Sequence, residues 1–431
     1  MNISKFQIIV LVVFVLFLVG GVIAFATYKG GGSSNTLPTV TIWGTFPEDV
    51  FDQYIGSINN AAAESLSIRY VQVSPASFSS QFISALARGA GPDVILVTAD
   101  SILPHHDKLA PIPFSALPQR TFTDTYIQEA NTYISSNGIY ALPFVVDPLV
   151  MYWNRDMFDA AGVATYPTTW DQFTGLNKKL TSKDQNGYVR KSAIALGLFG
   201  NVNNAREILG TLFLQSGNPV TGISSSGEIQ TTIKLGYPAD PQNVVTFFTK
   251  FVNPNNPDYS WNRSLPTAKS AFLAGSLATY FGFASELLDI KEKNPNLNYD
   301  VALMPQIKNG VRATYGRMYG FSIVRSSPNI NAAYQVISQL TSSQYIPYIS
   351  SKLYLPSVRR NVIDQGSTDP NITIFNQSAL ISRTWIDVDP NRSAQIMSDM
   401  IESYTSGQKT LTEAIQDAGD QYDLVLKQAT Q

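Results

Sequence analysis

The sequence predicts an α/β protein made of two lobes. Strand-like and helix-like patterns alternate along the chain from Leu37 onward. This alternation is typical of sheets covered by helices. The chain is 431 residues long and 44% hydrophobic, which is more than one compact core usually holds. Two lobes are therefore expected.

The elements that open the first lobe follow the order expected of a doubly wound sheet. Strand-like runs cover Thr39–Trp43, Leu66–Val73 and Asp93–Thr98. Helical patterns lie between them, from Val50 to about Glu64 and over Phe78–Arg88. Ligands of such sheets bind beyond the carboxyl ends of the strands. The residues that follow the first and third strands therefore mark two edges of an expected pocket.

A second set of elements follows. Strand-like runs at Gly138–Asp147 and Leu149–Trp153 lead into a helix over Arg155–Ala161. Beyond about Ser192 the pattern is mostly helical, with a polar interruption at Thr221–Gln230. This second set is expected to build the second lobe.

Composition excludes several classes of function. The net charge is only −2 and no basic stripe occurs, so no nucleic-acid partner is expected. Cysteine is absent, and the histidines are the adjacent pair His105 and His106. This removes thiolate chemistry, disulfides and most zinc sites. Neither a G-x-S-x-G nor an H-E-x-x-H motif occurs. We expect no catalytic residue, no metal and no cofactor.

The N-terminal segment is strongly apolar. Residues 6–28, between Lys5 and Lys29, are 23 residues without a charge. About 20 apolar residues suffice to cross a bilayer as a helix. A long signal segment is the alternative, since Ala24-Phe25-Ala26 offers an A-x-A cleavage site. The length of the run favours an uncleaved transmembrane anchor, with the rest of the chain outside the cytoplasm. Residues 29–36, rich in Gly and Ser, are expected to form a flexible tether.

Several segments together carry a resemblance to a known family. In order they are GPDVILV (91–97), YALPFVVDPLVMYWNRDMFDAAGV (140–163), YPTTWDQF (166–173), AFLAGSLATYFGF (271–283), LMPQIKNG (303–310), GFSIVRSSPNINAAYQVISQL (320–340), LPSVRR (355–360) and TSGQKTLTEAIQDA (405–418). Each motif alone is weak. As an ordered set over nearly all of residues 39–427, the chain resembles the solute-binding proteins of the maltose-binding type, the sugar-binding components of ABC importers.

The resemblance implies a two-lobed periplasmic-binding-protein-like fold with a hinge and an interlobe cleft. In this chain one N-terminal transmembrane helix would precede that fold. The implied crossings between lobes lie near Phe144–Asp147, Thr279–Gly282 and Val324–Pro328. The N-lobe would combine residues 37–146 with 281–326, and the C-lobe residues 147–280 with 327–431. The absence of cysteine is a departure, because many members of the family are lipoproteins.

The resemblance also implies a function. The protein would bind a mono- or oligosaccharide outside the cytoplasm, in the periplasm or at the cell surface, and deliver it to the permease subunits of an ABC transporter. A monomer is expected. One alternative is an envelope glycan hydrolase, which would need two carboxylates ~5–9.5 Å apart. Another is a ligand-sensing module for a membrane receptor, which would share the fold and differ only in its partner.

The candidate site residues are aromatic or charged. A sugar offers hydroxyls, which suit carboxylates and amides, and an apolar C–H face, which suits an aromatic ring. By position after the strands and at the implied crossings, the ligand-binding candidates are Trp43, Phe46, Asp100, Asp147, Trp153, Phe283, Arg317, Tyr319 and Trp385.

Four of the candidates also have a structural alternative. Trp43 and Phe283 could be core rings, and Asp147 could cap a turn before Pro148. Asp100 could be a solvated loop residue. Arg317 leaves a sugar acid or phosphosugar open as the ligand.

Overall fold

A computed structural model of the protein describes residues 38–61, 67–224, 229–236 and 239–430. The expected anchor (6–28) and tether (29–36) lie outside these residues. Within the described part, no helix is both long and apolar enough to span a membrane. The elements that follow belong to one compact unit, Val40–Gln431.

One large mixed sheet runs through this unit. Its strands are β1 (Val40–Gly44), β2 (Ile68–Gln72), β3 (Val94–Thr98), β4 (Leu109–Ala110), β7 (Leu142–Asn154), β8 (Ser182–Lys183), β9 (Val189–Ile194), β12 (Leu277–Phe283), β13 (Tyr299–Ala302), β14 (Thr314–Val324) and β15 (Ser382–Arg383). The main path is β2-β1-β3-β14-β7-β12-β9-β8. To this path β13 adds on β7, and β4 and β15 add on β14. Two short hairpins, β5 (Ile134–Ser135) with β6 (Gly138–Ile139) and β10 (Thr221–Ile223) with β11 (Ile229–Thr231), stand apart.

Helices cover the sheet. They are α2 (Glu48–Ala61), α3 (Phe78–Ala87), α4 (Ile102–His105), α5 (Gln119–Thr125), α6 (Arg155–Ala160), α7 (Gln172–Leu180), α8 (Ala205–Ser216), α9 (Pro241–Thr249), α10 (Ala268–Leu273), α11 (Glu286–Lys293), α12 (Ile330–Leu340), α13 (Ile346–Leu353), α14 (Arg360–Ile363), α15 (Pro370–Leu380), α16 (Pro390–Thr405) and α17 (Leu411–Thr430). Two short 3-10 segments, η2 (Ala99–Ser101) and η4 (Gln128–Tyr133), lie near the site described below.

The first half of the molecule is built on β2, β1, β3 and the adjoining ends of β14 and β7. β3 is buried along Val94–Val97, as its unbroken apolar run predicts. α2 buries Phe51, Tyr54, Ile55 and Ile58, a spacing that places all four on one helical face. The Phe51 ring stacks on Tyr70 of β2, with 4.1 Å between ring centroids.

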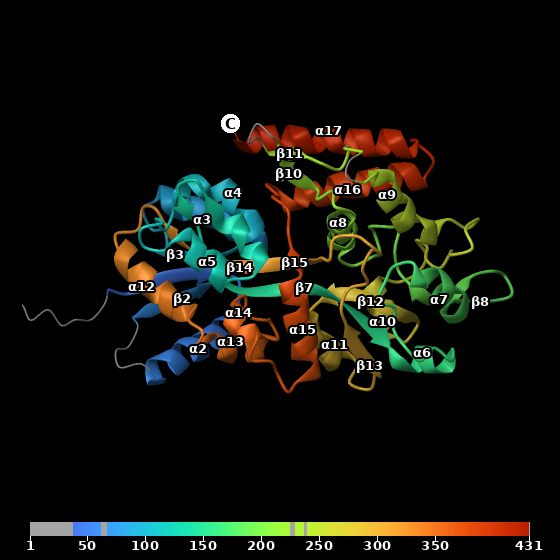
Figure 1. Cartoon of the computed structure of the whole chain (residues 1–431), viewed down its shortest axis with the longest axis horizontal. Coiled ribbons are helices and arrows are strands. Elements are labelled where there is room, and N and C mark those ends of the chain that lie inside the picture. Colours follow the sequence, from blue (N-terminus) through green and yellow to red (C-terminus); the bar gives the residue numbers. More distant parts are fainter. Residues whose placement is uncertain (1–37, 62–66, 225–228, 237–238, 431) are drawn as a thin grey trace, which may run out of the picture. The chain divides into compact units, whose positions relative to one another are not determined.

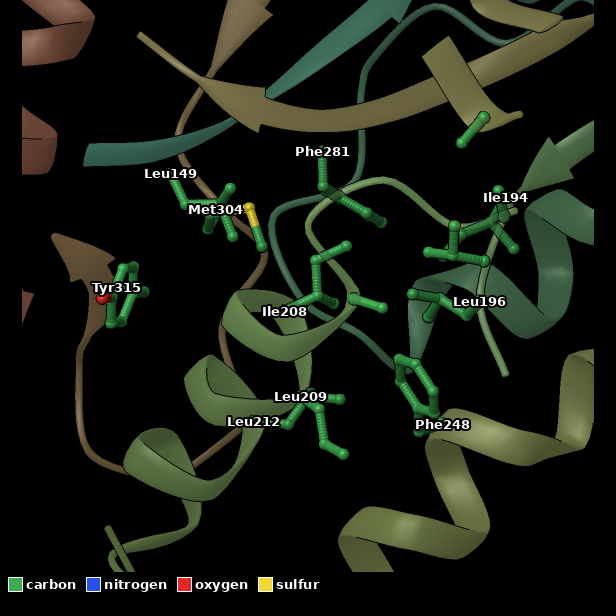
Figure 2. Close-up of a cluster of buried hydrophobic side chains, with 14 of the residues drawn as sticks. Leu149, Ile194, Leu196, Ile208, Leu209, Leu212, Phe248, Phe281, Met304 and Tyr315 are labelled. Carbon is green, nitrogen blue, oxygen red and sulfur yellow. The ribbon is translucent and has the colours of Figure 1, made fainter. Parts of the chain in front are cut away.

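The second half is built on the remainder of β7 with β12, β9, β8 and β13. Its core surrounds α8, which is buried over most of its length. Figure 2 shows Ile208, Leu209 and Leu212 of this helix among Phe281 of β12 and Phe248 of α9. α16 and α17 run side by side on this half (Figure 1).

The packing differs from the expected lobe boundaries in two places. α12 packs on β1, β7 and β14, and α13 packs on α2, so residues 330–353 belong to the first half and not to the expected C-lobe (Figure 1). β12 pairs with Leu149–Trp153 and with β9, and β13 pairs with Met151–Asn154. Residues 281–302 therefore stay in the second half instead of joining the expected N-lobe.

Three connections join the halves. β7 and β14 each run through both, and the chain passes over a third time between α14 and α15, since α15 packs on β7 and β13. β7 is one strand of 13 residues although Pro148 lies inside it. Pro148 pairs with Gly316 and Pro143 with Gly320 of β14.

Candidate ligand-binding site

β7 and β14 pass between the halves at Asp147 and Arg317, which are paired across the two strands. Asp147 is buried, and its carboxylate accepts hydrogen bonds from the backbone N–H (3.0 Å) and the hydroxyl (2.7 Å) of Ser285. Burial raises the pKa of Asp147 to about 6, against the opposing effects of Arg317 and Ser285. Asp147 therefore has an internal partner and holds the turn after β12.

One face of β14 carries three polar or aromatic side chains across this passage. Tyr315, Arg317 and Tyr319 lie on the same face because alternate residues of a strand point the same way. The Arg317 guanidinium lies 4.1 Å from the centre of the Phe283 ring. Tyr319 packs against Phe46, with 4.8 Å between ring centroids. β14 thus brings Phe283 of the second half and Phe46 of the first half to one strand face.

Asp100 reaches this face from the end of β3. Thr98, the last residue of β3, is paired with Tyr319, and its hydroxyl donates to the Asp100 carboxylate. Burial raises the pKa of Asp100, while the Thr98 hydrogen bond and the positive charges of Arg206 and Arg317 oppose the rise. Asp100 therefore lies close to two arginines, one at the passage and one in the second half.

Arg206, in the first turn of α8, is the centre of a buried ionic group. Its guanidinium donates to Asp387, and to Glu207 at 2.9 Å. It also lies 4.9 Å from the centre of the Trp385 ring and 5.7 Å from that of Tyr315. The arginine is only 7% exposed, and its Nε has no hydrogen-bond partner within the described residues.

Trp385 is fixed against α8 by close packing. A Cβ at Gly210 would lie 2.4 Å from the Trp385 ring, so glycine at this position lets the indole approach the helix backbone. The indole also packs on Tyr315, with 5.1 Å between ring centroids. Its Nε1 is buried and has no partner among the described residues. The second half thus places a tryptophan packed against α8 beside an arginine that is paired with two carboxylates.

Glu129 of η4 is as deeply buried as Asp147. It is 2% exposed, and neither of its oxygens has a hydrogen-bond partner in the described part of the chain. Its Oε2 lies against the backbone of β14, where a Cβ at Gly316 would be 2.4 Å away. Burial raises the pKa of Glu129 well above 4.5, aided by the negative charge of Asp100 and opposed by Arg383.

Two predicted site residues lie away from this cluster. Trp153 is six residues beyond Asp147 on β7, about 20 Å along the strand. Its ring packs on Phe158 and Tyr166 inside the second half. Trp43 is half-buried on β1, and within the described residues its ring makes no contact with the rings of the cluster.

The structure brings together six of the nine predicted residues around the passage. They are Phe46, Asp100, Phe283, Arg317, Tyr319 and Trp385, with Asp147 bound just beside them. Sequence reasoning missed Arg206, Glu129 and Asp387. The only sign of Arg206 in the sequence was an arginine near the start of a mostly apolar helical run.

The cluster suits recognition of a polar ligand better than covalent chemistry. Carboxylates accept and guanidinium groups donate hydrogen bonds, while the aromatic rings offer apolar surface. Among the described residues, no group of three or more His, Cys, Asp or Glu side chains is arranged to hold a metal ion.

Two cavities lie elsewhere, in the second half. One of about 740 Å³ is lined by the 253–264 loop and by Tyr404 and Thr405 of α16. The other, of about 550 Å³, lies between Trp170, Phe247 and the Lys308–Gly310 turn. Neither is lined by the residues of the cluster at the passage.

The two-lobed α/β sheet with strands passing between the lobes defines a periplasmic-binding-protein-like fold. Comparison with known proteins agrees. The sequence profile of the bacterial extracellular solute-binding proteins matches residues 26–346, about three quarters of the chain. The chain belongs to this family.

Individual relatives are distant. A binding protein of Brucella abortus (strain 2308) is 22% identical over 317 residues, which cover 71% of this chain and 72% of the relative. Among solved structures, the cyclic α-maltosyl-1,6-maltose binding protein from Arthrobacter globiformis has a TM-score of 0.74 at 14% identity, covering 91% of this chain and all of that one. The sugar-binding protein MalE from Xanthomonas citri has a TM-score of 0.71 at 17% identity, covering 91% and 98%. At these identities the structural likeness shows the fold alone.

Proposed function

We propose that this protein binds a mono- or oligosaccharide at the passage between its halves and delivers it to the permease subunits of an ABC importer. The observation that carries the proposal is the cluster itself, in which the Asp100 carboxyl of the first half lies in the electrostatic field of Arg206 from the second half and of Arg317 at the passage. The rings of Phe283 and Trp385 lie against these arginines. The names of MalE and of the Arthrobacter protein, both sugar binders, support the same ligand class.

The proposed roles follow from each side chain's chemistry. Asp100 accepts hydrogen bonds from sugar hydroxyls, and Arg206 and Arg317 donate to ring or hydroxyl oxygens. Phe46, Phe283, Tyr319 and Trp385 supply the apolar surfaces for C–H faces. We assign Asp147 to holding the Ser285 turn. Trp43 and Trp153 have no role in this proposal.

Because both halves contribute groups, binding is proposed to be coupled to their closure. β7 and β14 would act as the hinge, with the third connection beside them. A ligand favours the closed form only by the difference between its affinities for the closed and the open form.

The protein acts outside the cytoplasm, as its family does. We further propose that residues 6–28 form an uncleaved transmembrane anchor and residues 29–36 its tether. The support is the 23-residue uncharged run, which exceeds the ~20 residues needed to cross a bilayer. A tether would keep the binding protein close to its permease at high effective concentration.

A glycan hydrolase needs two carboxyl groups free to flank a glycosidic bond. The relatives found are binding proteins. Of the two aspartates among the candidate site residues, Asp100 and Asp147, the second is already occupied by its contacts with Ser285. We therefore propose a binding protein without enzymatic activity.

The first experiment is a thermal-shift screen of the full-length protein in detergent against mono- and oligosaccharides, sugar acids, polyols and amino acids. A ligand at 100 times its Kd should add about 2.7 kcal/mol to the free energy of unfolding. We expect a sugar to shift the wild-type Tm and the shift to vanish in Asp100→Asn.

Asp107→Asn is the matched control. Asp107 is an exposed aspartate a few residues further along that forms an ion pair with Lys108. It should keep the full ligand-induced shift. Shifts with non-sugar solutes only would reject the carbohydrate, and cleavage of a glycan in the same samples would reject the binding-protein role.

A further inference from the structure

Glu286, the first residue of α11, accepts hydrogen bonds from the end of β12, three residues before it, and from the turn before α8, 82 residues away. Each of these segments carries or adjoins a residue of the candidate site. We propose that Glu286 is a positioning residue for ligand binding, which fixes Phe283 and the start of α8 relative to each other. This inference rests on the proposed function, because it concerns the same site.

The first segment is the end of β12. Glu286 Oε1 accepts from the backbone N–H of Phe283 at 2.9 Å. The Phe283 carbonyl oxygen accepts from the buried Tyr152 hydroxyl at 2.7 Å. Side chains therefore hold both the N–H and the C=O of Phe283, and the ring under the Arg317 guanidinium has a fixed backbone.

The second segment is the turn before α8. Asn204 Nδ2 donates to the same Glu286 Oε1 at 3.0 Å and to the Phe281 carbonyl at 3.2 Å. Asn204 has a left-handed backbone, with φ of 57°, and directly precedes the helix that carries Arg206. One carboxylate oxygen thus links the turn that precedes Arg206 to the backbone of Phe283.

The other oxygen is anchored on the side away from the site. Glu286 Oε2 accepts from the Tyr280 hydroxyl at 2.7 Å and pairs with Lys269 Nζ at 2.7 Å. Lys269 also pairs with Asp289 at 2.7 Å. At Gly282, a Cβ would lie 3.0 Å from Glu286 Oε1 and 2.6 Å from the Tyr280 ring, so glycine leaves room for the carboxylate.

The experiment compares the variants Glu286→Ala, Glu286→Gln and Asp289→Asn in the full-length protein. Glutamine keeps the Oε1 acceptor for Phe283 and Asn204, whereas alanine removes it. Asp289→Asn is the matched control. It weakens the other ion pair of Lys269, the one with Asp289, and leaves the Glu286 carboxylate in place. Hydrogen exchange of the apo protein is followed in residues 203–210 and 281–287.

We expect Glu286→Ala to raise exchange in both segments together, and Glu286→Gln and Asp289→Asn to leave both near wild type. Affinity for maltotetraose should fall about tenfold in Glu286→Ala, in line with losing hydrogen bonds to a charged group, and recover in Glu286→Gln. Asn204→Gly keeps the left-handed turn but removes the amide that bonds to Glu286 and Phe281, so it should loosen 203–210 more than 281–287, where the Phe283 N–H bond to Glu286 remains. This variant serves if the alanine variant does not fold.

Unchanged exchange in either segment of Glu286→Ala, or equal loosening in Asp289→Asn, would overturn the positioning role. If the wild type binds no maltotetraose, the proposed ligand fails, while the exchange data still decide the role of Glu286.

Discussion

The two halves present opposite kinds of chemistry to the passage between them. The first half contributes Asp100 and Glu129, carboxyls whose burial raises the pKa of each. The second half contributes Arg206 and Trp385, which hold each other and are held by Asp387 and the Gly210 backbone. The difference is that Arg206 of the second half is paired with carboxylates of its own half, whereas Glu129 of the first half has no hydrogen-bond partner among the described residues.

The largest expected effect comes from breaking the ion pair between Arg206 and Asp387 in the second half. Asp387→Asn removes one of the two carboxylates paired with a buried arginine and leaves Glu207. Breaking a buried ion pair typically costs about 3–5 kcal/mol in the free energy of unfolding, and the remaining Glu207 pair places the expected loss at the lower end. Chemical denaturation of the variant measures this loss. Asp417→Asn, in an exposed pair with Lys409, should cost less than about 1 kcal/mol. Equal losses of stability in the two variants would show that the buried Arg206–Asp387 pair matters no more than an exposed pair.

A smaller effect is expected from crowding Trp385. In Gly210→Ala the new methyl would lie 2.4 Å from the indole, and overpacking of this kind costs about 1–3 kcal/mol. Gly175→Ala in α7 has nothing within 4 Å and should be neutral or stabilising by a few tenths of a kcal/mol. Thermal unfolding of both variants checks this. A harmless Gly210→Ala would show that the indole is loosely held.

The smallest expected effect concerns Glu129 of the first half, and it is a change in how stability depends on pH. The pKa of Glu129 is raised in the folded protein, so the folded state holds this proton to higher pH than the unfolded chain does. The stabilisation is full below the ordinary value of 4.5 and is lost as pH rises through the folded-state pKa. Asp147 acts with the same sign between 3.8 and about 6.

Glu129→Gln should therefore make stability fall less steeply as the pH rises above 4.5, so that the variant gains stability relative to wild type with increasing pH. Urea unfolding at a series of pH values measures both slopes. Asp147 is present in both proteins and serves as the internal reference. Parallel curves would mean that Glu129 is hydrated or paired in solution.

The sequence predicted the parts of this molecule that local pattern determines. The runs around β1 and β3 and the helical stretch of α3 are found within a few residues of their expected bounds. Asp93, which opens the expected third strand, has a structural role, since its carboxylate accepts from Thr41 N–H at 2.8 Å and from the Ser327 hydroxyl at 2.6 Å.

What local pattern could not supply was the choice of partner. The apolar face of α12 shows that the helix packs on something, but not on which half, so residues 330–353 were assigned to the wrong side. Arg206 was missed for a related reason. Its partner Asp387 is 181 positions away, and no periodicity reports such a distance.

β7 and β14 are bonded to each other as they cross, with one register shift between Tyr319 and Gly320. Two strands joined in this way behave mechanically as a single ribbon, which bends across its flat face more readily than its strands slide past one another. Under the proposed closure, the halves would therefore move along one arc and would not swivel freely. A motion restricted to one arc returns the two halves to the same relative orientation each time they close. The proposed permease would then meet the same composite surface in every transport cycle.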